Sequence, residues 1–236
     1  MRTNKFRLSL AVVGLLVAAS VTNAAAETDG WFVGGQLGLR GLSVKVDASA
    51  QGSTYITGSD GEWVDGGFSF GAQGNGDETG VKYGLLAGYK QFFTENFGAR
   101  YYAGADFGHY TYNYNANADA LYNFMVKENF ELGVFAGLWL GYVIHDLGNN
   151  EYFENPSGVD FGLNVGLRAN IAQNHGVELF GRFGFLEQKS EYKWNSPYNG
   201  AYETVGGGYV ASSSDVRTEI KCSQPYHIGV RYIYSF

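Results

Sequence analysis

Histidine, aspartate and serine residues are the side chains in this sequence that could perform hydrolytic chemistry. His109 lies near Asp106 and His145 lies beside Asp146, so each histidine has a carboxylate that could orient it as a general base. The serine-rich tract 212–215 could supply a nucleophile. A catalytic triad is defined by three-dimensional geometry, however, and chain spacing does not provide it. We expect the histidines and serines to be solvated loop groups and the protein not to be an enzyme.

Metal and redox chemistry are not indicated either. The four histidines are dispersed without the spacing of a ligand set: His109, His145, His175 and His227. The segment 47–80 holds six carboxylates and no Lys or Arg; it could bind divalent cations loosely, but a solvated acidic loop is the commoner case. The single cysteine, Cys222, excludes an intramolecular disulfide. We expect no catalytic, metal-binding or cofactor-binding residues.

The N-terminal segment has the pattern of a cleavable secretory signal. Three basic residues precede the apolar run 8–21, and the alanine run 24–26 supplies a cleavage site before Glu27. The apolar run is shorter than the roughly 20 residues of a membrane-spanning helix. We expect residues 1–26 to be removed and residues 27–236 to form one domain. Loss of three basic residues shifts the formal net charge from −7 to −10, which disfavours nucleic acid as a partner.

The remaining chain alternates apolar and polar residues with a period of two, as strands with one apolar and one polar face do. Eight such segments are predicted: 31–46, 81–90, 97–108, 118–126, 130–144, 159–171, 177–185 and 226–236. The composition, with 35 Gly, 18 Tyr and 17 Phe against 3 Pro, agrees with many strands. The expected fold is all-β, an antiparallel up-and-down transmembrane β-barrel of eight strands.

The C-terminal segment is the most informative of the eight. From Tyr226 to Phe236 its even-numbered residues are apolar or aromatic and most of its odd-numbered residues are polar or glycine; only Ile233 breaks the pattern. The chain ends on an aromatic residue. This arrangement is typical of the last strand of an outer-membrane barrel, which lies between lipid and a polar lumen.

The connections between the segments differ in length and predict an orientation. Short turns follow the second, fourth and sixth segments, and longer connections follow the others, including 113–117. Short turns of such barrels face the periplasm and long loops face outward. We therefore expect extracellular loops at 47–80, 145–158 and 187–225. A hairpin pattern within 191–205 leaves ten strands as an alternative.

Twelve charged residues fall on the polar face of these segments and are expected in the lumen: Arg40, Lys82, Lys90, Arg100, Asp106, Asp119, Glu131, Asp160, Arg168, Glu178, Arg182 and Arg231. Side chains can fill a lumen of about eight strands. Because charges in a low-dielectric interior must pair or be hydrated, we expect ion pairs and no open channel. Alternation alone would also fit a soluble barrel with its apolar face inside, but the secretion signal and the glycines on the polar face favour the outer membrane.

Several motifs resemble the barrel domain of the Helicobacter outer membrane protein family, the Hop-related group. They lie at 88–93, 96–102, 120–124, 164–170 and 175–178. The resemblance covers the second to the eighth segment and implies an outer-membrane barrel. Some members of that family are adhesins for host-surface glycans, and others are described as porins. The adhesin-type members carry a large exposed domain, for which this chain has no room.

The C-terminal strand also resembles the signal that the barrel-assembly machinery recognises. The residues concerned are His227, Gly229, Tyr232, Tyr234 and the terminal Phe236. The resemblance implies that they act in assembly rather than in the activity of the mature protein.

Three functions from different classes follow. The leading one is a structural or surface-interaction role, adhesin-like, through extracellular loops in which Trp63 and Trp194 are aromatic anchors. The first alternative is a porin-like channel and the second is an outer-membrane enzyme. The expected location is the bacterial outer membrane. The expected partners are outer-membrane lipid and lipopolysaccharide, the barrel-assembly machinery and a host-surface ligand, and the expected state is a monomer.

Overall fold

The computed structural model describes residues 29–57, 63–127, 129–148, 154–196, 202–203 and 209–236. These residues are almost entirely in strands: β1 (Gly30–Thr57), β2 (Trp63–Phe92), β3 (Phe97–Gly108), β4 (Thr111–Lys127), β5 (Phe130–His145), β6 (Ser157–Ile171), β7 (His175–Gly184), β8 (Glu187–Ser196), β9 (Tyr202–Glu203), β10 (Tyr209–Ser223) and β11 (His227–Ser235). Among them, no helix is long and apolar enough to span a membrane. Residues 1–26, the expected signal peptide, lie outside the described part of the chain.

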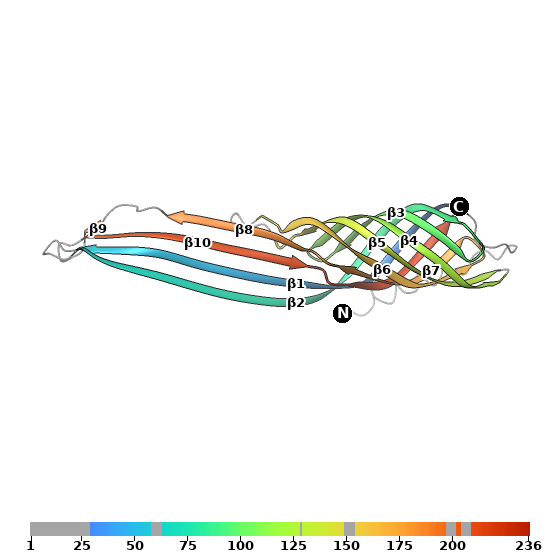
Figure 1. Cartoon of the computed structure of the whole chain (residues 1–236), viewed down its shortest axis with the longest axis horizontal. Coiled ribbons are helices and arrows are strands. Elements are labelled where there is room, and N and C mark those ends of the chain that lie inside the picture. The colour runs from blue at the N-terminus through green and yellow to red at the C-terminus, as the bar shows by residue number, and fades with distance from the viewer. Residues whose placement is uncertain (1–28, 58–62, 128, 149–153, 197–201, 204–208) are drawn as a thin grey trace, which may run out of the picture.

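Eight strands pair in order around a barrel. Each strand from β1 to β6 pairs with the next, and β11 pairs with β7 on one side and with β1 on the other. All of these pairings are antiparallel. The order of pairing therefore returns to the first strand (Figure 1). The prediction of an all-β, antiparallel, up-and-down fold is confirmed, with eight strands around the ring and not ten.

Two of the remaining strands continue barrel strands rather than adding to the ring. β8 follows β7 after residues 185–186, and β10 precedes β11 across residues 224–226. The register changes at the second junction: Arg40 lies opposite His227 of β11, whereas Val44 lies opposite Cys222 of β10. One extra residue is thus accommodated in 224–226, a segment containing Pro225. Proline cannot donate to a strand ladder, and such irregular positions suit it.

Four strands continue beyond the others at the end opposite the C-terminus (Figure 1). They lie side by side in the order β8, β10, β1, β2. We call this four-stranded sheet the extension; it comprises residues 43–57 of β1, 63–79 of β2, β8 and β10. Its β1–β2 ladder is unbroken from the barrel pair Gly30 and Lys90 to the pair Thr57 and Trp63.

The extension corrects the expectation of loops at 47–80 and 187–225, because most of their described residues are in strands. Gly, Ser and Asp have low strand propensity, but a ladder that begins in the barrel can propagate through them. The hairpin pattern within 191–205 also has a different outcome, since β8 pairs with β10 and adds no strand to the ring. The third region, 145–158, does connect two strands, because β5 ends at His145 and β6 begins at Ser157.

A second correction concerns residues 113–117, which belong to β4 and not to a loop. The turn between β3 and β4 consists of His109 and Tyr110, and Tyr110 has a positive φ of 60°. The asparagines in this stretch alternate with the outward Tyr114 and Ala116 and point into the lumen. There Asn115 Nδ2 lies 3.1 Å from Asp106 Oδ2. Buried hydrogen bonding thus compensates for the poor strand propensity of asparagine.

Glycines make the barrel interior narrow enough to be filled. A Cβ added at Gly84 would lie 2.1 Å from Asp106 Oδ1, and one at Gly162 would lie 1.7 Å from the carbonyl oxygen of Phe183. Contacts this short cannot be accommodated without movement. The small residues therefore create the space that the large charged side chains occupy.

Candidate functional site

The barrel lumen holds the charged residues that the alternation pattern placed there. All twelve are buried: Arg40, Lys82, Lys90, Arg100, Asp106, Asp119, Glu131, Asp160, Arg168, Glu178, Arg182 and Arg231. They comprise seven basic and five acidic side chains.

Three arginines and three carboxylates form ion pairs in the middle of the lumen. Arg100 Nη2 lies 2.8 Å from Asp119 Oδ2, and the Arg100 guanidinium also contacts Glu178. Arg231 Nη1 lies 3.1 Å from the other oxygen of Glu178. Arg182 Nη1 lies 2.7 Å from Asp106 Oδ2. Each of these charges is thus compensated by a partner within the lumen, as burial requires.

Aromatic rings pack against the same arginines. The Arg100 guanidinium carbon lies 4.5 Å from the centre of the Phe135 ring, and that of Arg231 lies 4.7 Å from Phe180. Both distances are within the range of cation–π attraction. A cavity of about 10 Å³ is lined by Arg100, Glu178 and their neighbours; this is about the space of one water molecule. Side chains therefore fill this part of the barrel.

The end of the lumen nearest the extension has a different arrangement. Lys82 Nζ donates to Gln224 Oε1 at 2.9 Å, and Arg40 donates to the carbonyl oxygen of His109. Asp160 Oδ1 accepts the backbone N–H groups of Phe161, Phe185 and Leu186 at 2.8, 3.2 and 2.9 Å. Asp160 thereby satisfies backbone donors at the junction between β7 and β8.

The residues considered for hydrolytic chemistry are spread over different regions. Asp106 is paired with Arg182 in the lumen, whereas the His109 ring contacts the Tyr110 ring in the turn at a tilt of 52°, with 3.7 Å between ring centres. His145 is buried at the end of β5, where its Nε2 lies 2.9 Å from Gln188 Oε1. The serine tract lies in β10, where Ser213 and Ser214 are opposite Ser53 and Gly52. Within the described residues, no group of three or more His, Cys, Asp or Glu side chains could hold a metal ion.

The two faces of the extension have the opposite polarity to those of the barrel wall. In the barrel portion of β1, Gln36 and Arg40 are buried inward and Trp31, Val33 and Leu39 are exposed outward. Beyond Gly41 the inward positions become apolar and the outward positions become polar or charged, while the β1–β2 register does not change. We call the two surfaces of the extension the lumen-side face and the outer face. Polarity thus inverts along continuous strands.

The outer face carries a network of ion pairs between neighbouring strands. Lys45 Nζ lies 2.9 Å from Glu187 Oε1, and Lys221 Nζ lies 3.2 Å from Asp47 Oδ2. Arg217 contacts Glu191 and lies 3.9 Å from Glu219. A groove of about 660 Å³ crosses this face, lined by residues of β1, β2 and β10 that include Asp47, Gln73, Arg217 and Glu219.

These contacts change the titration of two glutamates on the outer face. The hydrogen bond from Lys45 lowers the pKa of Glu187 below its ordinary value, and the charges of Lys189 and Lys221 act in the same direction. A hydrogen bond from Lys193 similarly lowers the pKa of Glu191, with a further contribution from Arg217. Both carboxylates are therefore ionised over a wider pH range than free glutamate.

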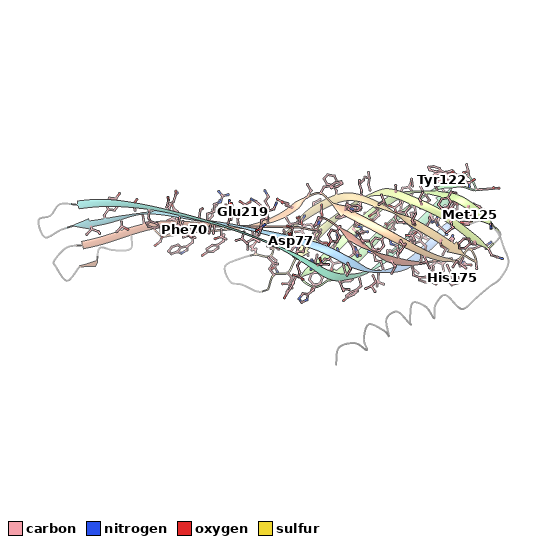
Figure 2. The ribbon with its side chains drawn as sticks, turned by 90° about the horizontal axis from the view of Figure 1, so that it is seen from below. Phe70, Asp77, Tyr122, Met125, His175 and Glu219 are labelled. Atoms are coloured by element: carbon pink, nitrogen blue, oxygen red, sulfur yellow. The ribbon has the colours of Figure 1, made fainter. Side chains whose placement is uncertain are left out.

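The lumen-side face of the extension is mainly apolar. By register it carries Val44, Val46, Ala48, Ala50, Phe68, Phe70, Tyr192, Trp194, Val216 and Ile220. Phe70 is 65% exposed and Trp194 is 48% exposed, and these two residues share one cross-strand row with Ala50 and Val216. Figure 2 labels Phe70 and Glu219 in the extension. Trp63, the other expected anchor, begins β2, but its side chain lies outside the described part.

The C-terminal residues assigned to assembly lie in the strand that pairs with both β1 and β7. His227 is buried and packs edge-on against Phe180, with 4.9 Å between ring centres. The Tyr232 hydroxyl lies 2.6 Å from His175 Nδ1 at the opposite end of the barrel. Phe236 donates its backbone N–H to the carbonyl oxygen of Trp31 at 3.0 Å. The expected exception, Ile233, packs in a lumen cluster with Phe32, Leu86 and Tyr102.

Comparison with protein families identifies this barrel. A family model described as Helicobacter outer membrane protein matches residues 84–236. The chain belongs to that family. The match begins within β2 and runs to the C-terminus, so β1 and the extension part of β2 lie outside it. The resemblance found in the sequence is thus confirmed, and so is the location in the bacterial outer membrane. Comparison with curated protein sequences gives no match.

Solved structures of other bacterial proteins are similar to this member of the family. Outer membrane protein OprG from Pseudomonas aeruginosa is 15% identical, with 89% of this chain and 99% of that chain covered and a TM-score of 0.37. Neisserial surface protein A is 16% identical, with coverages of 75% and 95% and a TM-score of 0.32. Ail, the attachment invasion locus protein of Yersinia pestis, is 11% identical, with coverages of 75% and 97% and a TM-score of 0.28.

Sequence reasoning missed two groups of residues. The first is the lumen asparagines of β4, in which Asn117 Nδ2 donates to Asn115 Oδ1 at 2.6 Å and Asn117 Oδ1 accepts from Asn164 Nδ2 at 3.0 Å. The second is the apolar face of the extension. A period-two signal was present in both groups, since the asparagines occupy every second position and Phe68 and Phe70 are separated by one residue.

Proposed function

We propose that this outer-membrane protein anchors a recognition element at the bacterial surface, and that the extension is this element. The barrel has short turns at the end that holds the C-terminus, which supports an orientation with that end in the periplasm. The extension would then project outward, which fits an adhesin-like, surface-interaction role better than a purely structural one.

The observation that carries this proposal is the inversion of polarity along β1 and its neighbours. A barrel wall needs apolar residues outside to contact lipid, and Leu39 still fits that environment with 53% of its surface exposed. Lys45 and Asp47, on the same face further along β1, are suited to water. The extension is therefore built for the aqueous side of the membrane, and its apolar face provides the contact area that a partner could bury.

The filled lumen argues against the porin-like alternative. Planar-bilayer recording of the refolded protein tests it, and we expect poor conductance because Arg100, Arg231 and Glu178 occupy the middle of the barrel. Large, stable and reproducible conductance steps would favour the channel. Membership of a family of outer-membrane barrel proteins gives the enzyme alternative no support.

Removal of the extension tests the proposed function directly. Deleting residues 46–74 and 190–220 leaves the pairs Lys45 with Asn75 and Lys189 with Lys221, and a two-residue Asn-Gly turn can join each pair. We expect the truncated barrel to reach the outer membrane with normal heat-modifiable mobility. Bacteria that carry the truncated barrel should attach to host epithelial cells no better than bacteria that lack the protein. Unchanged attachment by the truncated barrel would disprove the proposal.

A further inference from the structure

The outer edge of β2 is an open strand edge. In the barrel, Lys82–Phe92 pairs with β3. From Gly80 to Trp63 the only pairing of β2, within the part of the chain that the structure describes, is with β1. Edge strands present backbone N–H and C=O groups that another chain can bind.

This edge lacks the features by which proteins usually block strand addition. Lysine, proline, bulges and short strand length are the common protections. Between Trp63 and Val81 the sequence has no Lys, Arg or Pro, and β2 is 30 residues long with an unbroken register to β1. The opposite edge of the extension differs, because β8 has 10 residues and carries Lys189 and Lys193. Protection is thus present on one edge and missing from the other.

The glycines of this edge leave space beside the strand. A Cβ added at Gly71, Gly74 or Gly76 would meet no atom within 4 Å. The packing of this chain therefore does not require glycine at these positions, in contrast to Gly84 in the barrel. Glycine weakens a strand and often marks a place where another backbone approaches closely. These positions can receive large side chains of an incoming strand.

The charge of the edge selects among possible partners. Asp65, Asp77 and Glu78 are the charged residues between Trp63 and Val81, and all three are acidic. A second copy paired antiparallel through the same edge about Gly71 would place Asp65 opposite Asp77, and directly opposed like charges destabilise a sheet. A strand with lysine or arginine would instead be attracted.

We propose that the β2 edge of the extension binds an extended basic segment of a partner protein by antiparallel strand addition. Main-chain hydrogen bonds supply the affinity in this mode, and side-chain pairing supplies the selectivity. The inference rests on the proposed role of the extension in recognition, and it adds the class of the partner and the mode of contact.

A synthetic peptide tests the proposal on the refolded protein in detergent. The probe is a fluorescein-labelled 12-residue peptide in which lysine alternates with valine, and anisotropy measures its binding. We expect saturable binding that weakens at least tenfold when alternate amides are N-methylated, because methylation removes the donors of the ladder. A peptide with glutamate in place of lysine should also bind at least tenfold more weakly. Equal binding of the N-methylated peptide would overturn strand addition.

A matched pair of variants locates the site. Asn75→Lys adds a basic residue to the open edge and should weaken binding of the lysine peptide about fivefold, the effect of about 1 kcal/mol of like-charge pairing. Asn195→Lys makes the same change on β8 and should leave binding unchanged. Equal effects of the two substitutions would overturn the assignment to β2. Concentration-dependent dimers of the refolded protein that Asn75→Lys abolishes would assign the edge to a second copy instead.

The truncated barrel separates this inference from the proposed function. If truncation abolishes attachment to cells while Asn75→Lys changes neither attachment nor peptide binding, the extension recognises its partner by another surface and strand addition is wrong. If truncation does not alter attachment, the proposed function itself fails, whatever the peptide does.

Discussion

The barrel and the extension share β1 and β2, but the apolar side chains lie on opposite faces in the two regions. Within the barrel, β1 directs Arg40 inward and Leu39 outward; in the extension it directs Val46 inward and Lys45 outward. The backbone geometry is the same antiparallel ladder throughout. Strand conformation therefore does not decide which face is apolar. In the orientation that we propose, the surroundings decide it, with lipid around the barrel and water around the extension.

The largest effect on the barrel should come from placing charge on the lipid-facing side of the last strand. Changing Tyr232 and Tyr234 to Asp should prevent β11 from joining β1 and β7, and the surface level of heat-modifiable barrel should fall at least tenfold. Electrophoresis of outer-membrane fractions measures it. The matched control changes Phe68 and Phe70 to Asp in the extension, where we expect normal levels. Normal levels of the tyrosine variant would show that this strand does not control assembly.

The next largest effect should come from a buried carboxylate. Glu178→Ala leaves Arg100 and Arg231 without a shared partner in the lumen, and removal of one member of a buried ion pair costs about 3–5 kcal/mol. Urea titration of the refolded barrel, followed by tryptophan fluorescence, measures the loss. Glu191→Ala removes a carboxylate from the exposed network of the outer face and should cause no measurable change. Similar unfolding curves for the two variants would contradict the packed-lumen interpretation.

Glycine substitutions compare crowding in the two regions. Gly84→Ala forces movement of Asp106 and of the Ala105 carbonyl and should destabilise the barrel by about 1–3 kcal/mol. Gly74→Ala introduces a methyl group into open space and should be neutral or stabilising by up to about 1 kcal/mol. The same urea titration measures both effects. A larger loss for Gly74→Ala than for Gly84→Ala would reverse the expected order.

The smallest effect should be a pH dependence confined to the extension. The pKa of Glu187 is lowered in the folded protein by the hydrogen bond from Lys45. A lowered carboxyl pKa stabilises the fold above the unfolded value, near 4.3, and this contribution is lost as pH falls through the folded pKa. The protection of β8 amides against hydrogen exchange, relative to the intrinsic rate at each pH, should therefore fall modestly below about pH 4, while that of β4 amides should not. Lys45→Met should remove the dependence; an equal loss of protection in the two strands would refute it.

The sequence predicted the barrel well because lipid and lumen impose a regular alternation. Each inward charge lies two residues, or a multiple of two, from the next on its strand, as Arg100 and Asp106 do. The extension was harder to predict. Its strands combine Gly, Ser and Asp, which also make loops, and the apolar side chains change face near Gly41. A prediction that expects the apolar residues to stay on the same alternate positions therefore ends the strand near Gly41.

The pairing of particular charges could not be derived from the pattern. Glu178 contacts Arg231, which lies directly opposite it in the β7–β11 ladder, and Arg100 of β3, which reaches it across the lumen. The approach of Arg100 depends on the curvature of the wall and on a rotamer packed against Phe135. Asn113 and Asn117 were interpreted as loop residues because isolated asparagine favours turns, and only the lumen makes them strand residues.

The extra residue at 224–226 determines which side chains of β10 lie on the lumen-side face of the extension. Odd-numbered residues of β11 point inward, as His227 and Arg231 do, whereas the even-numbered Cys222 and Gln224 are buried on the other side of the junction. If residues 224–226 were instead drawn into a regular ladder opposite β1, every side chain of β10 would turn over relative to its neighbours. Arg217 and Glu219 would then join the valines and phenylalanines, and Val216 and Ile220 would face the lysines. The one extra residue thus keeps the apolar side chains of β10 on the same face of the extension as those of β1 and β8.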